Sequence, residues 1–147
     1  MTPLHLERRE LLVGAAALAA ASLVPSALAA EEHHHHAMLA SPLLSSISIC
    51  LEKGQVCLSH CLVLLGEGEK AMAGCARSVK DMLAVCGALQ SLAAAQSPAL
   101  ASQARVALEV CKACATECKK HADKHAECKA CLEACEACAA ECKKLAA

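Results

Sequence analysis

The 147-residue sequence contains no phenylalanine, tyrosine or tryptophan. Aromatic rings fill much of the core in most domains of this size, so other side chains must fill the core here. Basic residues are not in excess either, because the formal net charge is −1 and lysine and glutamate are interspersed. This balance argues against a nucleic-acid-binding surface or a basic membrane-binding patch. The length favours one domain rather than two.

Cysteine, in contrast, is abundant, with thirteen residues in the chain. That proportion approaches the range of disulfide scaffolds. The odd number and the helical spacing of the cysteines both argue against a disulfide framework. Bridges within one helix would strain it, whereas bridges between helices remain an alternative in an oxidising compartment.

Residues 1–29 have the features of an export signal. Arg8 and Arg9 precede an apolar run, 11–24, that is too short to span a bilayer, and residues 27–29 (Ala-Leu-Ala) supply a small-residue cleavage site. The arginine pair is typical of a twin-arginine signal, which exports folded proteins; an ordinary secretory signal is the alternative. Either signal predicts a bacterial protein of the periplasm or the extracellular space, with no membrane insertion after cleavage.

Residues 30–41 predict a flexible lead-in between this signal and the folded domain. The lead-in contains four consecutive histidines, His33 to His36. Such a tract either binds divalent metal or belongs to a solvated linker, and the sequence favours neither interpretation. Residues 42–147 then form the single folded domain.

The sequence of that domain predicts four helices of about 20 residues joined by short loops. Their expected ranges are 42 to about 65, 69 to 95, 98 to 120, and 127 to the C-terminus. Ser41 and Ser97 each stand before a proline, which is the pattern of an N-cap followed by the first helical residue, and Asp123 is the candidate N-cap of the last helix. The fold class is therefore all-α: an antiparallel up-down-up-down four-helix bundle with a cysteine-lined core.

This topology gives the two ends of the bundle different chemistry. One end collects side chains that can bind metal, namely His60, Met72, His121 and His125. The other collects apolar side chains, namely Leu43, Leu44, Leu89, Leu92, Leu100 and Leu145. We expect the first end to be an opening and the second to be an apolar plug.

The cysteines fall on one face of each predicted helix. In residues 128–142 five of them recur at spacings of 3, 4, 3 and 4, which is the rhythm of a helical heptad. A role as a small buried apolar residue explains one or two cysteines, but thirteen on matching stripes indicate metal binding. The full set is Cys50, Cys57, Cys61, Cys75, Cys86, Cys111, Cys114, Cys118, Cys128, Cys131, Cys135, Cys138 and Cys142.

The pattern favours Cu(I), which is soft and prefers thiolate and thioether ligands. Zinc and iron–sulfur sites need closed sets of four ligands, into which a continuous helical stripe does not divide naturally. General sequestration of zinc or cadmium remains one alternative. A thiol–disulfide buffer is another, although C-x-x-C pairs such as Cys111 and Cys114 lie in mid-helix and lack the field that activates a thioredoxin-type thiolate.

Charge favours a capacity of about one copper ion per cysteine. If each Cu(I) took two private thiolates, thirteen thiols would make six sites, each with a net charge of −1 in the core. Burying unpaired charge is unfavourable, whereas thiolates that bridge neighbouring ions leave the core neutral.

Five stretches resemble the bacterial copper storage proteins, in particular their exported, twin-arginine class. They are CLSHC (57–61), AMAGC (71–75), VCGAL (85–89), VCKACATECKK (110–120) and AECKACLEACEACAAECKKLAA (126–147). The resemblance covers about residues 43–147. It implies a non-enzymatic store of many Cu(I) ions along the axis of a four-helix bundle.

The resemblance also implies ligands and partners. The ligands are all thirteen cysteines, with His60 and Met72 added at the open end. The helix-connecting loop that holds His121 and His125 departs from the family pattern. A homotetramer, a recipient copper enzyme and a copper chaperone are the implied partners.

Overall fold

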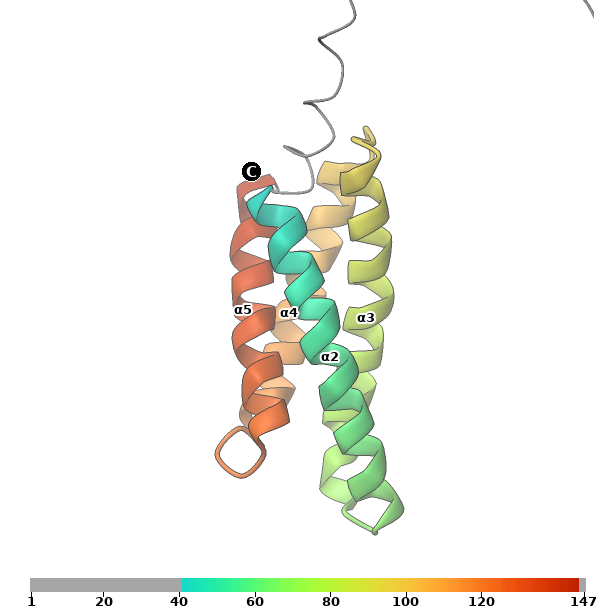
Figure 1. The fold of residues 1–147 in the computed structure, drawn as a ribbon, viewed down its shortest axis with the longest axis vertical. Coiled ribbons are helices and arrows are strands. Elements are labelled where there is room, and N and C mark those ends of the chain that lie inside the picture. The colour runs from blue at the N-terminus through green and yellow to red at the C-terminus, as the bar shows by residue number, and fades with distance from the viewer. Residues whose placement is uncertain (1–40, 146–147) are drawn as a thin grey trace, which may run out of the picture. The chain divides into compact units, whose positions relative to one another are not determined.

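A computed structural model describes residues 41–145 of the chain (Figure 1). This part consists of α2 (Pro42–Gly66), the short 3-10 helix η1 (Lys70–Met72), α3 (Ala73–Ala94), α4 (Leu100–Lys119) and α5 (Ala126–Leu145). These described residues contain no strand, so the all-α prediction is confirmed. The predicted export signal and the predicted lead-in up to residue 40 lie outside the described residues.

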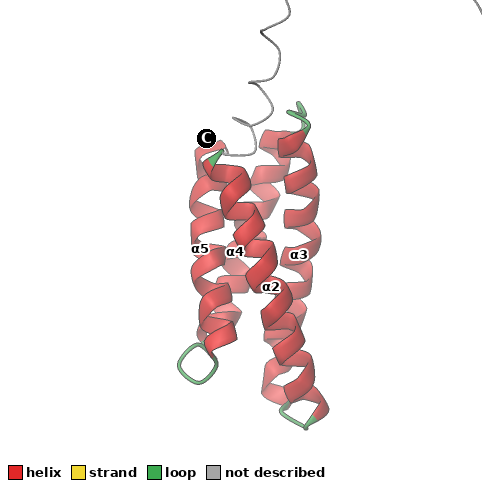
Figure 2. Cartoon of the chain, viewed as in Figure 1, coloured by secondary structure: helices red, strands yellow, loops and turns green. Residues whose placement is uncertain are grey.

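The helices form an antiparallel bundle in which each packs against its neighbours in the chain and α5 closes the ring against α2 (Figure 2). Short loops join them, at 67–72, 95–99 and 120–125. The first and third loops lie at one end of the bundle, and the second lies at the other end beside the C-terminus (Figure 1). The predicted up-down-up-down topology is confirmed.

The ends of α2 follow from ordinary capping chemistry. The Ser41 hydroxyl accepts a hydrogen bond from the Leu44 N–H at 3.2 Å, and Pro42 occupies the first turn, as predicted. At the other end Gly68 adopts a φ of 98°, which allows the Glu69 N–H to donate to the Leu64 carbonyl at 2.9 Å. Glycine suits this left-handed position because it has no Cβ.

Two predicted N-caps were wrong. The Ser97 hydroxyl accepts from the Ala99 N–H at 3.2 Å, but this bond belongs to a turn before α4, which begins at Leu100. Asp123 is not the N-cap of α5. The loop 120–125 closes on itself through a 3.0 Å bond from the His125 N–H to the His121 carbonyl, so α5 begins only after His125, at Ala126.

The core of the bundle consists mainly of sulfur-containing and small side chains. Among residues 41–145 no polar or charged side chain is buried apart from the thiols. Apolar side chains with no exposed area fill the remaining space: Ile47, Val79, Met82, Leu89, Ala104 and Ala107. Sulfur and alanine therefore take the place of the missing aromatic rings.

Gly54 of α2 lies close to two side chains of α3. A Cβ added at Gly54 would lie 2.5 Å from the Met82 Cε and 2.9 Å from the Leu83 Cδ2. Gly87 does not bring α3 close to another helix in this way, because an added Cβ there meets nothing within 4 Å. At Gly74 an added Cβ would meet the Glu117 carboxylate at 2.6 Å, so that glycine does make room for a side chain of α4.

The apolar end of the bundle is largely as expected. Leu44 and Leu89 are buried, and Leu43, Leu92 and Leu100 are half-buried. Leu145 is 37% exposed and does not belong to the plug. It stands in the last turn of α5.

Candidate metal centre

All thirteen cysteine side chains are fully buried, and all are free thiols. The four helices each contribute a stripe of sulfur because residues three or four apart share a helix face. Burial of this number of thiols in one core is the main feature of the site.

The sulfurs form compact groups across the helices. In one group each helix supplies one cysteine, and all four sulfurs lie within 4.8 Å of one another; its members are Cys50, Cys86, Cys111 and Cys138. The other groups, defined in the same way, are Cys57, Cys61, Cys75 and Cys128; Cys57, Cys118 and Cys131; and Cys114, Cys131 and Cys135. Cys57 and Cys131 each belong to two groups, and these four groups do not include Cys142.

Short sulfur–sulfur distances link these groups into a continuous series. The Sγ atoms of Cys50 and Cys135 are 3.8 Å apart, which joins the four-helix group to the rest. The sulfurs of Cys114 and Cys131 are 4.0 Å apart. Inside the first group, the sulfurs of Cys86 and Cys111 are 3.6 Å apart. An ion at one group thus has sulfur ligands of the next group beside it.

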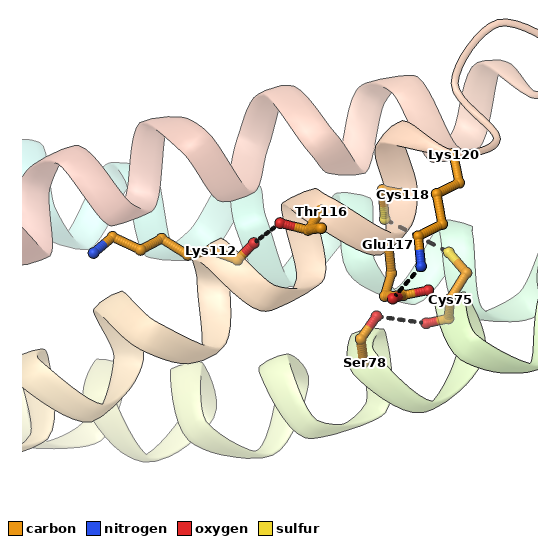
Figure 3. Close-up of polar contacts among 7 residues, drawn as sticks. All are labelled: Cys75, Ser78, Lys112, Thr116, Glu117, Cys118 and Lys120. Atoms are coloured by element: carbon orange, nitrogen blue, oxygen red, sulfur yellow. Dashed lines mark hydrogen bonds and ion pairs between the residues drawn. The ribbon is translucent and has the colours of Figure 1, made fainter.

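The contact between α3 and α4 shows how sulfur and charge are separated (Figure 3). The Cys75 and Cys118 sulfurs meet at 3.6 Å inside the bundle, and the Ser78 hydroxyl donates to the Cys75 carbonyl at 3.0 Å. Glu117 pairs with Lys120 outside this contact. The charges of α4 therefore compensate one another at the surface, while the sulfurs face one another inside.

Burial also affects the protonation of two of the thiols, Cys61 and Cys128. It raises the pKa of Cys61 and of Cys128 above the ordinary value of 9.0, and negative charge at Cys57 or Cys75 would raise both further. At neutral pH these two metal-free thiols are protonated and uncharged. Metal binding by them releases protons, because the thiolate is the ligand.

The distances suit coordination by thiolate but do not select the metal. For metal–sulfur bonds of about 2.3 Å, sulfurs are about 3.8 Å apart in a tetrahedral site and about 4.0 Å apart in a trigonal one. The bundle offers contacts of 3.6 to 4.0 Å between sulfurs. Copper and zinc geometries both fit these contacts with small side-chain rotations.

Two methionines lie in the core with the thiols. Met72, a predicted ligand, ends η1 with 2% of its surface exposed, three residues before Cys75. Met82 was not predicted as a ligand, yet its thioether sulfur lies 3.4 Å from the Cys50 sulfur. Its place on the inner stripe of α3, together with the preference of Cu(I) for thioethers, was the signal that could have identified it.

The structure places His60 at the edge of the bundle, with contacts other than those expected. Its Nε2 atom lies 2.9 Å from the Nδ1 atom of His125 and 3.7 Å from a carboxylate oxygen of Glu127. The rings of His121 and His125 have centroids 6.5 Å apart. The expected grouping of histidines at this end is therefore present, and Glu127 joins it without having been predicted.

Solved structures of copper storage proteins resemble this bundle. The metal-free copper storage protein 3 of Bacillus subtilis is 28% identical with a TM-score of 0.63, and the match covers 72% of this chain and 97% of that one. The Cu(I)-bound copper storage protein BsCsp3 gives the same identity and TM-score over 71% and 95% of the two chains. The copper storage protein Ccsp of Streptomyces lividans, loaded with 10 copper equivalents, is 26% identical with a TM-score of 0.64 over 76% and 84%.

No sequence of a curated protein matches this chain. The family model that describes copper storage proteins matches residues 35–147. That match spans more than half of the sequence and includes every buried thiol of the bundle, so the chain belongs to the copper storage protein family.

Proposed function

We propose that this protein stores many Cu(I) ions as cargo, bound by cysteine thiolates inside the bundle, and that it does so without catalysing a reaction. The linked series of sulfur groups carries the proposal. Zinc sites are normally closed sets of four ligands, whereas Cys57 and Cys131 are each shared between two groups. Shared sulfurs suit an ion that accepts bridging thiolates, and soft Cu(I) is such an ion.

The proposed ligands are the thirteen cysteines, with His60 and Met72 added at the open end of the bundle. Met72 supports this assignment because its thioether is buried near the thiols of α3. His60 stands immediately before Cys61 in the sequence, and its side chain is partly exposed to solvent. We propose that these two side chains bind copper transiently as it enters and leaves the core.

We propose a capacity of about one ion per cysteine. Among the described residues the core contains no buried cation that could offset negative copper–thiolate units. Thirteen bridging thiolates and thirteen Cu(I) ions give a neutral core, which avoids the free-energy penalty of buried unpaired charge.

Native mass spectrometry of the reduced protein, titrated anaerobically with Cu(I), tests both capacity and metal choice. We expect saturation well above six ions per chain and close to thirteen, the number of thiols. A molar excess of Zn²⁺ over Cu(I) should leave the copper count unchanged. Saturation at six ions or fewer would reject the bridged, neutral core, and replacement of copper by zinc would favour general soft-metal sequestration.

The alternative of a thiol–disulfide buffer is less well supported. Every thiol has an exposed fraction of 0%, so a protein disulfide cannot reach one without opening of the bundle. Exchange requires attack by an accessible thiolate on a disulfide sulfur. Slow reaction of the folded, metal-free protein with a bulky disulfide reagent would agree with storage, and rapid reaction of several thiols would favour the redox role.

We further propose that the protein forms a homotetramer through the outer face of α2. Ile49, Val56 and Val63 recur every seven residues on this face and are 48%, 50% and 58% exposed. The charged residues of α2 itself, Glu52 and Lys53, pair with each other at 2.8 Å. An uncharged stripe of this kind favours association with another apolar surface.

The same helix passes a length and composition test for a membrane span, with a mean hydropathy of 1.3. Its inner face, however, carries Cys50, Cys57 and Cys61, which pack inside the bundle. A second copy of the chain is therefore the better occupant of the outer face.

Sedimentation of Val56→Glu should show dissociation, whereas Val106→Glu, on the exposed side of α4, should not. A wild-type monomer would reject the proposal.

Delivery and location complete the proposal. The leader at residues 1–29 supports export, by the twin-arginine route, to the periplasm or beyond. A copper enzyme there would receive the stored ions, directly or through a copper chaperone. Fractionation of bacteria that express the protein, with Arg8 and Arg9 changed to lysine as the comparison, tests the route of export.

A further inference from the structure

A cluster of imidazole and carboxylate groups lies at the loop end of the bundle, outside the sulfur groups. His60 comes from α2, His125 immediately precedes α5, and Glu127 stands in the first turn of α5. The three side chains thus join the first helix of the bundle to the last. We propose that they form a binding site for a borderline divalent cation, Zn²⁺ or Cu²⁺, outside the sulfur groups, and that His60 serves this site when it is not passing Cu(I) to the core.

Two of the three ligand–ligand distances, both measured from His60, are close to those that such an ion requires. With bonds of about 2.0 to 2.1 Å, the ligand atoms of a tetrahedral zinc site lie about 3.3 Å apart. In the metal-free cluster, the His60 Nε2 atom lies 2.9 Å from the His125 Nδ1 atom and 3.7 Å from the Glu127 Oε2 atom. These two distances bracket the required one.

The geometry also leaves room for the ion to enter. The side chains of His60 and Glu127 are 23% and 36% exposed, so Glu127 is free to turn toward His125. The imidazole rings of His60 and His125 have centroids 4.9 Å apart and are inclined at 56°. Binding replaces the hydrogen bond between the two rings with two metal–nitrogen bonds.

The chemistry of the ligands separates this site from the core. Imidazole and carboxylate suit zinc and Cu²⁺, whereas thiolate and thioether select Cu(I). The exposed fractions of His60 and Glu127 leave the cluster in contact with solvent. Water and open ligand positions are therefore available to the ion on the outer side.

The test uses protein loaded to saturation with Cu(I), so that the thiols are occupied, with His33 to His36 replaced by serine to remove their contribution. Zn²⁺ affinity is measured anaerobically by competition with a chromophoric chelator. We expect His125→Asn and Glu127→Gln each to weaken zinc binding at least tenfold. The matched controls, Glu133→Gln on the exposed side of α5 and His121→Asn, should change it less than threefold.

Copper analysis before the titration keeps this proposal distinct from that of the store, because a failure to load copper is seen before any zinc is added. Co²⁺ provides a second measurement: imidazole and carboxylate ligands give no sulfur-to-cobalt charge-transfer band in the difference spectrum. The proposal is overturned if the loaded protein binds no Zn²⁺, if His125→Asn binds it as tightly as the parent, or if the charge-transfer band appears.

Discussion

The sulfur of Cys57 lies 3.9 Å from the sulfur of Cys128, at the meeting point of two sulfur groups. Through one group Cys57 is linked to Cys61 and Cys75, and through the other to Cys118 and Cys131. Its position gives Cys57 sulfur neighbours from α3, α4 and α5. Cys142, near the end of α5, lies outside the four groups and has no comparable position.

This difference predicts unequal losses from two single substitutions. Cys57→Ser removes a bridging thiolate from two groups, so it should lower the copper count at saturation more than Cys142→Ser does. Both changes keep the side-chain size nearly constant, and circular dichroism would show whether the helices are retained. Copper counts by native mass spectrometry decide the matter; equal losses would mean that Cys57 serves a single ion.

The bundle should be helical without metal. The helix caps at Ser41 and Gly68 consist of backbone and hydroxyl hydrogen bonds, and alanine, leucine, glutamate and lysine favour helix throughout. Small zinc-binding domains differ, because they unfold when the metal is removed. Far-ultraviolet circular dichroism of the reduced, metal-free protein should give a strongly helical spectrum, and a coil spectrum would show that copper is needed for folding.

Sequence patterns predicted the inner faces of the helices well. Cysteines at spacings of three and four, such as Cys131, Cys135 and Cys138, share a helix face whatever the helix packs against, and each is buried as expected. The capping serine of α2 was equally local. Properties that depend on one helix alone could thus be read from the sequence.

Contacts between helices were not predictable in the same way. The 3.4 Å contact between the sulfurs of Cys50 and Met82 depends on the axial stagger and rotation of α2 against α3. Glu127 faces His60 for a similar reason, since the loop 120–125 sets where α5 begins. A single sequence contains no direct signal for how α2 is placed against α3, or for where α5 begins.

The close approach at Gly54 leads to a prediction about stability. Gly54→Ala places a methyl group against Met82 and Leu83, so it should destabilise the metal-free protein by about 1 to 3 kcal/mol through overpacking. Gly87→Ala is the matched control in α3. It meets nothing within 4 Å and should stabilise the helix by about 0.5 to 1 kcal/mol.

Urea denaturation of the reduced protein, followed by circular dichroism, measures both changes. The pair is informative because the chemical change is the same at both positions and only the surroundings differ. A stability gain at Gly54 would show that Met82 and Leu83 can move aside without penalty, and the expected overpacking at Gly54 would then be wrong.

Copper should enter at the end of the bundle where His60 and Met72 lie. His60 is partly exposed at the edge of the bundle, and Met72 is buried in η1, three residues before Cys75, so the two can pass an ion from solvent to thiolate. Replacing both by leucine should slow Cu(I) uptake, while the final capacity stays within about two ions of the original, because gating changes rates more than equilibria. Stopped-flow measurement of copper–thiolate absorbance, in zinc-free buffer, gives the rate. Met82→Leu, next to Cys50 and far along the bundle, is the control and should load at the normal rate. If the variant with leucine at both His60 and Met72 also loads at the normal rate, copper enters elsewhere.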